Sequence, residues 1–370
     1  MPSSANHLDQ NRARFQTNAM TMEVDDTRAP PGTDAGMAPA TREVVSAPEP
    51  HVAGTDYGIA DIGVYIPEQR IDTAARAPEL GIPASTLQNR IGFTALARKA
   101  GHEETSDLAY RAVQDLLRRH PVDPNDIGCL VVVTQNPDGT GIPQVSALLH
   151  GKLGWPATVP AFDVSLGCSG YVYGLAIVSG FLATRNAKAG ILVTADPYSK
   201  IVDPDDRGTA LLFGDGASAT LIERHGPWRL GRFDFGTAGQ HAHYLHTDDR
   251  RRLRMDGQAV ARFCLREIPR SIERTLSANG LALADVDRIL LHQGSRCVVE
   301  DIAKAIGAET KTLFVAADIG NTASSSVPIA LRCVIEEAPK TCTILLSTFG
   351  VGMSWGTVSV DFIPINGIEG

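Results

Sequence analysis

Cys168 lies in a short stretch whose composition could support nucleophilic chemistry, F-D-V-S-L-G-C-S-G-Y at residues 162–171. An apolar run typical of a strand precedes the cysteine, and a helical pattern follows it. Helix N-termini lower the pKa of a thiol, and Gly167 and Gly170 allow a tight strand-to-helix turn. A free cysteine is also among the most frequently buried residue types. Cys168 is therefore a nucleophile or a small core residue, and its position favours the nucleophile.

His292 and Asn321 are the candidate partners of such a thiol. His292 follows an apolar run in L-L-H-Q-G-S (290–295), where its ring could act as a base or donor. Asn321 stands before a predicted helix that has Pro328 in its first turn, and its amide could donate to an oxyanion. The segment F-G-V-G (349–352) could offer backbone N–H groups. Each also fits an ordinary structural role, as a hydrogen-bonded strand end, a capping asparagine or a tight turn.

Alternating strand and helix patterns predict an α/β fold that positions these residues. Residues 57–67 indicate a first strand that ends at Pro67. Residues 105–120 indicate an amphipathic helix with Thr105 or Ser106 as N-cap, and residues 122–135 indicate a turn and a buried strand.

The same order of elements recurs later in the chain, which predicts two similar halves. Residues 271–293 repeat the helix, turn and strand, so that Asp285 corresponds to Asp126. The segment F-G-D-G-A-S (213–218) is likewise repeated as F-G-V-G-M-S (349–354). We expect one half at 56–225 carrying the cysteine and another at 226–370 carrying the histidine and asparagine.

Composition excludes several other classes of protein. The net charge of −8 leaves no basic surplus for nucleic acid, and the apolar runs are too short to span a bilayer. The arginines at 250, 251, 252 and 254 are expected on a solvated face. Six scattered cysteines show no metal-ligand or disulfide spacing, so we expect no metal site and a reducing, cytoplasmic location. Residues 1–55 are rich in Pro, Ala, Ser and Thr and are expected to be a disordered extension.

Taken together, these stretches resemble the β-ketoacyl-acyl carrier protein synthase III family of thiolase-like condensing enzymes. The resemblance runs from Tyr57 to Pro364 and rests on the motifs R-I-G-F (90–93), S-D-L-A (106–109), G-C-S-G (167–170), D-R-G-T (206–209), L-F-G-D-G-A (212–217), M-D-G (255–257), H-Q (292–293), G-N-T (320–322) and F-G-x-G-x-x-W-G (349–356). It implies a duplicated, five-layered α/β/α/β/α fold.

The resemblance also implies catalytic roles. Cys168 would be the acylated nucleophile, and His292 and Asn321 would hold the carbonyl of the second thioester. The backbone N–H groups of Cys168 and Val351 would form the oxyanion hole. An acyl group would pass from coenzyme A or an acyl carrier protein to Cys168, and would then condense with the enolate of a decarboxylated malonyl thioester to give a β-ketoacyl product.

Binding roles follow from the same resemblance. Arg90 and Arg207 match positions that contact the nucleotide end of coenzyme A, and Gly294 and Ser295 match positions along the pantetheine arm. The family implies a homodimer in which Ile142 would cap the acyl pocket of the partner. It implies no permanently bound cofactor, because coenzyme A or carrier-protein thioesters are the substrates.

Departures from the family pattern affect the predicted substrate. Ser295 replaces an asparagine of the usual H-Q-A-N, Thr86 replaces a tryptophan that often stacks on adenine, and Ile142 replaces a phenylalanine. These changes favour a specialised fatty-acid or polyketide-type pathway over housekeeping initiation. Transfer of the acyl group to a hydroxyl or amine, or use of a non-malonyl donor, is the main alternative. A papain-like hydrolase and an inactive partner subunit fit the motifs less well.

Overall fold

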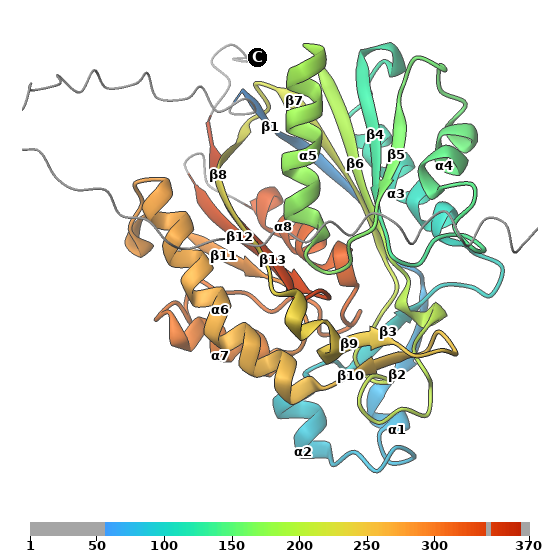
Figure 1. The fold of residues 1–370 in the computed structure, drawn as a ribbon, viewed down its shortest axis with the longest axis vertical. Coiled ribbons are helices and arrows are strands. Elements are labelled where there is room, and N and C mark those ends of the chain that lie inside the picture. The colour runs from blue at the N-terminus through green and yellow to red at the C-terminus, as the bar shows by residue number, and fades with distance from the viewer. Residues whose placement is uncertain (1–55, 338–341, 364–370) are drawn as a thin grey trace, which may run out of the picture. The chain divides into compact units, whose positions relative to one another are not determined.

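The protein is a mixed α/β structure, seen here as a computed structural model that describes residues 56–337 and 342–363. The extension predicted over residues 1–55 lies outside the described residues. The described part is built on a large sheet with helices on its faces (Figure 1). No helix within these residues is both long and apolar enough to cross a membrane.

A nine-stranded sheet runs through the described residues in the order β11-β12-β13-β8-β1-β7-β6-β4-β5. It has two arms, which meet where β1 pairs with β8 through Gly58↔Arg229 and Ile59↔Trp228. In each arm a parallel pair, β4–β6 or β11–β12, is followed by antiparallel pairs. The strands are β1 (Tyr57–Tyr65), β4 (Ile127–Val133), β5 (Ala161–Val164), β6 (Ala189–Ala195), β7 (Ala217–Arg224), β8 (Trp228–Thr237), β11 (Arg288–Leu291), β12 (Thr343–Gly350) and β13 (Ser354–Phe362).

The helices form three layers around the two arms. Helices α5 (Gly170–Arg185) and α8 (Ser326–Glu337) share one apolar core with strands of both arms. Helices α3 (Thr105–Arg119) and α4 (Val145–Leu153) cover the outer face of the first arm, and α6 (Gly257–Ala278) and α7 (Arg296–Ala305) cover that of the second. Figure 1 shows these two outer pairs on opposite sides, with α5 between them. The predicted five-layered α/β/α/β/α arrangement is therefore confirmed.

The predicted internal repeat is present in the order of elements. Asp126 ends the 3-10 turn Pro124–Asp126 between α3 and β4, and Asp285 ends the 3-10 turn Leu283–Asp285 between α6 and β11. The repeated F-G segments likewise lead into β7 and β13. The boundary predicted after residue 225 falls in the turn between β7 and β8, and the division into halves remains a prediction.

The start of α3 differs from the prediction that Thr105 or Ser106 is its N-cap. Glu104 is the N-cap, and its backbone N–H donates to Oδ2 of Asp107 at 2.9 Å in a capping box. The hydroxyl of Thr105 donates instead to the carbonyl of Asn136, and that of Ser106 donates to Asp138. Both hydroxyls therefore make tertiary hydrogen bonds. The first strand also ends slightly earlier than predicted, at Tyr65.

Short elements gather at one end of the sheet, beside α6 (Figure 1). They form two small antiparallel ribbons, β2 with β3 and β9 with β10, together with short helices. Their bounds are β2 (Gln69–Asp72), β3 (Ala95–Arg98), β9 (Leu245–Thr247), β10 (Leu253–Met255), α1 (Thr73–Arg76), α2 (Ala84–Thr86) and a π-helical turn at Leu87–Ile91. This end of the fold carries the cavity described next.

Candidate active site

Cys168 lies in the tight turn between β5 and α5, as the glycines around it predict. The N–H of Gly170 donates to the carbonyl of Gly167 at 2.8 Å, and Ser169 is the N-cap of α5. Gly350, at the end of β12, packs directly against the cysteine. A Cβ added to Gly350 would lie 2.6 Å from Cβ of Cys168, so only glycine permits this approach.

Burial dominates the acidity of the Cys168 thiol. The residue is 3% exposed, and this burial raises the thiol pKa, with the nearby Asp196 carboxylate raising it further. Burial also raises the pKa of Asp196, to about 7. The lowered pKa expected from the helix N-terminus is therefore wrong, because the loss of solvation on burial is the largest effect on this thiol.

His292 follows β11 directly and is anchored on both its backbone and its ring. Its N–H donates to the carbonyl of Ser347 at 2.9 Å, and its Nδ1 lies 2.7 Å from Oγ of Ser326. Burial lowers the ring pKa to about 3, so the imidazole is neutral near neutral pH.

Ser326 is the hydrogen-bond partner of Nδ1 in that neutral ring. Its Oγ accepts a long hydrogen bond from the backbone N–H of Gln293, at 3.4 Å, so the hydroxyl hydrogen is available to donate to Nδ1 of His292. With Nδ1 accepting, the ring proton is on Nε2. His292 can then donate a hydrogen bond from Nε2 without carrying a positive charge.

The side chain of Asn321 is held through its oxygen, which leaves the amide nitrogen available as a hydrogen-bond donor. Its backbone pairs with the segment around Phe213, with the N–H donating to Leu212 at 2.9 Å. Its Oδ1 accepts from the N–H of Ala323, also at 2.9 Å. The predicted turn role and the predicted donor role are thus compatible, because the oxygen closes the turn and Nδ2 stays available.

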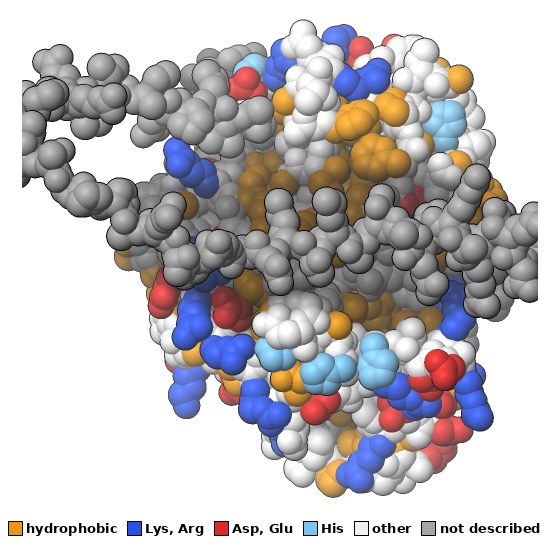
Figure 2. Space-filling model, viewed as in Figure 1, with side chains coloured by type: hydrophobic (Ala, Val, Ile, Leu, Met, Phe, Trp, Pro, Cys, Tyr) orange, Lys and Arg blue, Asp and Glu red, His pale blue; other side chains and the backbone are white. Residues whose placement is uncertain are grey.

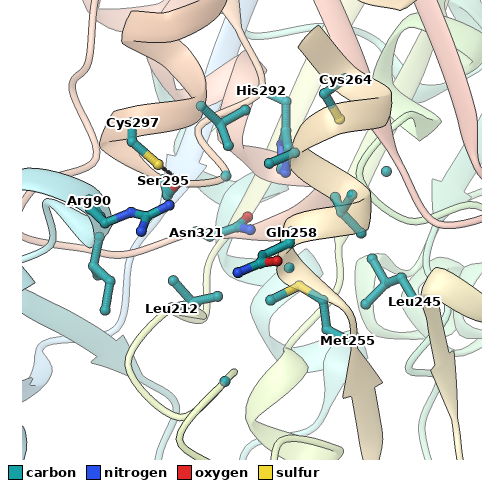
Figure 3. A pocket seen from close by; sticks show the side chains of 18 of the residues that line it. Arg90, Leu212, Leu245, Met255, Gln258, Cys264, His292, Ser295, Cys297 and Asn321 are labelled. Carbon is teal, nitrogen blue, oxygen red and sulfur yellow. Dashed lines mark hydrogen bonds between the residues drawn. The ribbon is translucent and has the colours of Figure 1, made fainter. Parts of the chain in front are cut away.

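One cavity of about 660 Å³ brings Cys168, His292 and Asn321 together. Figure 3 shows Arg90, Ser295 and Cys297 on one side of it and Leu245 and Met255 on the other, with His292 and Asn321 between them. Arg90 and Ser295 thus lie apart from Leu245 and Met255, with the side chains of His292 and Asn321 between them.

The structure brings some of the predicted binding residues to this cavity and leaves others outside it. Thr86, Arg90, Gly294 and Ser295 line the cavity. Arg207 is exposed and does not line it, although its neighbour Gly208 does. Ile142 is 91% exposed in the isolated chain and also lies away from the cavity.

Val351 borders a second, smaller cavity beside the first. Its carbonyl accepts from Oγ of Ser354 at 2.7 Å. Within the part of the chain that the structure describes, the N–H of Val351 has no hydrogen-bond acceptor, and the N–H of Cys168 interacts with its own sulfur. Both backbone donors lie close to the thiol.

Sequence reasoning missed several residues that shape the site. Ser326 forms a hydrogen bond with the His292 ring, yet in S-S-S (324–326) nothing distinguishes it from its neighbours. Gln258 and Cys264 line the cavity from α6. The adjoining M-D-G motif (255–257) entered only as part of the family resemblance, although its residues also line the cavity. Asp196 directly follows β6 and is 1% exposed, and its carboxylate acts electrostatically on the Cys168 thiol.

Comparisons with known proteins identify what this arrangement is similar to. The model of a family described as 3-oxoacyl-[acyl-carrier-protein (ACP)] synthase III matches residues 162–239, and that of its C-terminal domain matches residues 276–362. A beta-ketoacyl-[acyl-carrier-protein] synthase III from Deinococcus deserti is 33% identical over 83% of this chain and 91% of its own length. One from Listeria welshimeri is 31% identical over 82% of this chain and 98% of its own.

A solved structure supports the same likeness in three dimensions. A beta-ketoacyl-[acyl-carrier-protein] synthase III from Thermus thermophilus superposes with a TM-score of 0.77. The match has 29% sequence identity and covers 82% of this chain and 98% of the other. The likeness therefore extends over both arms of the sheet.

Proposed function

The chain belongs to the 3-oxoacyl-[acyl-carrier-protein] synthase III family, and we propose that it catalyses a decarboxylative Claisen condensation through Cys168, His292 and Asn321. The reaction joins an acyl group to a malonyl thioester and gives a β-ketoacyl product. One observation carries the assignment. The thiol of Cys168 and the unused donors of His292 and Asn321 line a single cavity.

The first half-reaction transfers the acyl group to Cys168. The sulfur attacks the thioester carbonyl, the bond to the departing sulfur breaks, and the thiol proton leaves with the released thiol. The backbone N–H groups of Cys168 and Val351 would hold the oxyanion, since neither donates to another residue among those described. Because the Cys168 pKa is raised, proton loss accompanies attack and does not precede it.

The second half-reaction needs donors that do not lose their protons to the enolate. Decarboxylation of the malonyl thioester releases carbon dioxide and leaves an enolate, whose oxygen would accept from Nε2 of His292 and Nδ2 of Asn321. The depressed pKa of His292 keeps the ring neutral, so it donates as an uncharged imidazole. The enolate carbon then attacks the acyl group, and Cys168 is released as a thiol after proton uptake.

The side of the cavity that carries Arg90 and Ser295 fits the thioester arm of the substrates. Arg90 would meet phosphate of coenzyme A, and Thr86, Gly294 and Ser295 would lie along the pantetheine. Arg207 is exposed near Gly208 and would reach only the outer part of a bound nucleotide. The substrates, carried on coenzyme A or on an acyl carrier protein, supply the reacting groups, and we propose no permanently bound cofactor.

We further propose a homodimer formed through the β5 edge of the sheet. β5 ends the strand order, so its outer backbone groups have no partner strand in the chain described. Phe162 on β5 and Phe181 on α5 are half-buried, with ring centroids 5.5 Å apart. Figure 2 shows hydrophobic side chains gathered around the position of α5. Ile142 would reach the partner's acyl pocket, which would explain its exposure in one chain.

Location and pathway complete the proposal. The cysteines, none of them in a disulfide within the described residues, fit a reducing cytoplasm. Thr86 and Ser295 both line the cavity, so their departures from the family pattern fall where substrate would bind. This supports a specialised fatty-acid or polyketide-type pathway.

The two half-reactions are tested separately. Incubation with a panel of acyl-coenzyme A thioesters should increase the intact protein mass by one acyl group. Cys168→Ala should abolish the increase, and Cys333→Ala, whose side chain is exposed on α8, should retain it. The acylated protein should then release carbon dioxide from malonyl-coenzyme A or malonyl carrier protein and form a β-ketoacyl thioester. Acylation without carbon dioxide release from any malonyl donor would contradict the condensation. Ester or amide products would instead support acyl transfer to a hydroxyl or amine.

A further inference from the structure

A second cavity, of about 250 Å³, lies against the turn that carries Cys168. Leu245 lines both cavities, and Val351, which follows Gly350 of the first, lines the second. A Cβ added to Gly167 would lie 2.5 Å from Oε1 of Gln135 in this second cavity. Because Gly167 immediately precedes Cys168, the second cavity begins beside the nucleophile.

The lining of the second cavity combines apolar side chains, including Tyr198 and Leu245, with the amide of Gln135; further polar residues that line it are Asn136, Ser165, His246 and Thr247. Tyr198 is buried and stacks on Phe213 with ring centroids 4.6 Å apart, and Leu245 is also buried. The hydroxyl of Tyr198 donates to Oε1 of Gln135 at 3.4 Å. The Nε2 group of Gln135 has no acceptor among the residues described. The lining therefore suits a short alkyl segment followed by an acceptor.

Arg251 borders the same cavity from the turn between β9 and β10. Its backbone has φ of 59°, which L-residues adopt rarely, and its N–H donates to the carbonyl of Asp248 at 2.8 Å. Oδ1 of Asp248 also accepts from the N–H groups of Arg250 and Arg252, each at 2.9 Å. The turn thus holds Arg251 at the cavity by backbone hydrogen bonds.

Among the arginines of this turn, Arg251 is the one that borders the second cavity. The carboxylate of Asp248 pairs with Arg254 at 2.8 Å, and Arg252 donates to the carbonyl of Val202. Among the described residues, the Arg251 side chain has no ion-pair or hydrogen-bond partner, and the neighbouring Asp249 is exposed. Of the four arginines predicted to lie on a solvated face, Arg250, Arg251 and Arg252 are exposed, whereas Arg254 is half-buried in its pair with Asp248. Arg251 in addition borders the second cavity.

We propose that the second cavity receives the acyl group carried by Cys168, and that Gln135 and Arg251 select a short acyl group ending in a carboxylate. This rests on the proposed acylation of Cys168. A carboxylate can accept from the guanidinium in two parallel hydrogen bonds, and its other lone pairs can accept from an amide. A methyl end would leave those donors without partners, and a site built to form hydrogen bonds rejects analogues that lack the acceptor. The cavity is smaller than the roughly 300 Å³ at which pockets for drug-sized ligands begin, so the acyl group is short.

Matched acyl thioesters test the proposal. Succinyl-coenzyme A is compared with butyryl-coenzyme A, and glutaryl-coenzyme A with valeryl-coenzyme A, together with the pantetheine thioesters of the same acids. The rate of Cys168 acylation is followed by intact protein mass. We expect the carboxylate-ended member of each pair to react about tenfold faster or more.

Variants of the arginine turn separate selection from folding. Arg251→Met should remove the preference while changing the butyryl rate by less than about twofold, because its apolar stem keeps most of the side-chain volume. Arg251→Lys should keep part of the preference, since the charge remains without the paired donors. Arg250→Met is the matched control, because Arg250 is adjacent but does not line the second cavity, and it should leave both rates unchanged.

The outcomes distinguish this proposal from the proposed function. The proposed selection is overturned if the wild-type protein is acylated faster by the methyl-ended thioesters. It is also overturned if Arg251→Met changes the acylation rates of both members of a pair equally. Neither result contradicts the proposed condensation. Absence of Cys168 acylation by every thioester of the panel overturns both.

Discussion

Replacing Ser326 by alanine should slow decarboxylation and leave acylation of Cys168 intact. Oγ of Ser326 lies 2.7 Å from Nδ1 of His292, and in the tautomer that the mechanism needs, with the ring proton on Nε2, the hydroxyl donates to Nδ1. Without it, the buried Nδ1 loses its partner and the tautomer with the proton on Nδ1 becomes populated. That tautomer cannot donate to the enolate oxygen from Nε2.

The magnitude follows from the hydrogen bond that is lost. A neutral hydrogen bond contributes about 1 kcal/mol, and a buried nitrogen left unpartnered costs up to about 3 kcal/mol. With about 1.4 kcal/mol per factor of ten, carbon dioxide release should slow by about fivefold to a hundredfold. Acylation uses the thiol and backbone donors, so its rate should change by less than about twofold.

The assay measures the two half-reactions on the same preparation. Intact mass follows acylation of Cys168, and carbon dioxide release from malonyl-coenzyme A follows decarboxylation. Ser324→Ala is the matched control, because that hydroxyl is buried in the same segment and has no hydrogen-bond partner among the described residues. An equal loss in both half-reactions, or an unchanged rate of decarboxylation in Ser326→Ala, would refute the tautomer argument.

Three further predictions concern burial around the thiol. An unfolded histidine takes up its proton near pH 6.5, whereas buried His292 does so only near pH 3. Between these pH values the unfolded state binds more protons than the folded state, so the free energy of unfolding decreases as the pH falls. Urea unfolding measures the free energy of unfolding of the wild type and of His292→Gln. The wild-type value minus the variant value should decline by about 1.4 kcal/mol for each pH unit of acidification well below pH 6.5, and a value independent of pH would contradict the argument. Gly350→Ala should destabilise the protein by about 1–3 kcal/mol and slow Cys168 acylation, because the added Cβ would meet Cys168. Gly180→Ala is the control, because the space around its Cβ is open, and it should change neither stability nor acylation. Equal effects of the two substitutions would refute the close-packing argument. Asp196→Asn should lower the Cys168 pKa, so that iodoacetamide alkylation begins at lower pH, and an unchanged profile would exclude the carboxylate as a cause.

The repeated layout could be predicted because it depends on local patterns. Buried strands such as β4 and β11 are continuous apolar runs, and the preceding turns each end in an aspartate, at Asp126 and Asp285. The prediction failed at the start of α3, where several hydroxyl-bearing residues compete for one cap. Thr105 and Ser106 bond to Asn136 and Asp138, which lie about thirty residues away, and Glu104 takes the cap.

The sequence by itself determined the α/β class and the repeated order of elements, because apolar periodicity and turns are set by neighbouring residues. Local pattern left both catalytic and structural roles open for His292 and Asn321, and the family resemblance is what grouped them with Cys168 as candidates. Only the tertiary structure decided the pKa values of Cys168 and His292 and the hydrogen bonds that hold their side chains. Solvation depends on everything packed around a group, so burial raised the pKa of Cys168 against the helix N-terminus. The hydrogen bond at Nδ1 of His292 likewise depends on Ser326, which lies 34 residues away on another element. The second cavity joins Gln135, Tyr198 and Arg251, whose proximity no local pattern encodes.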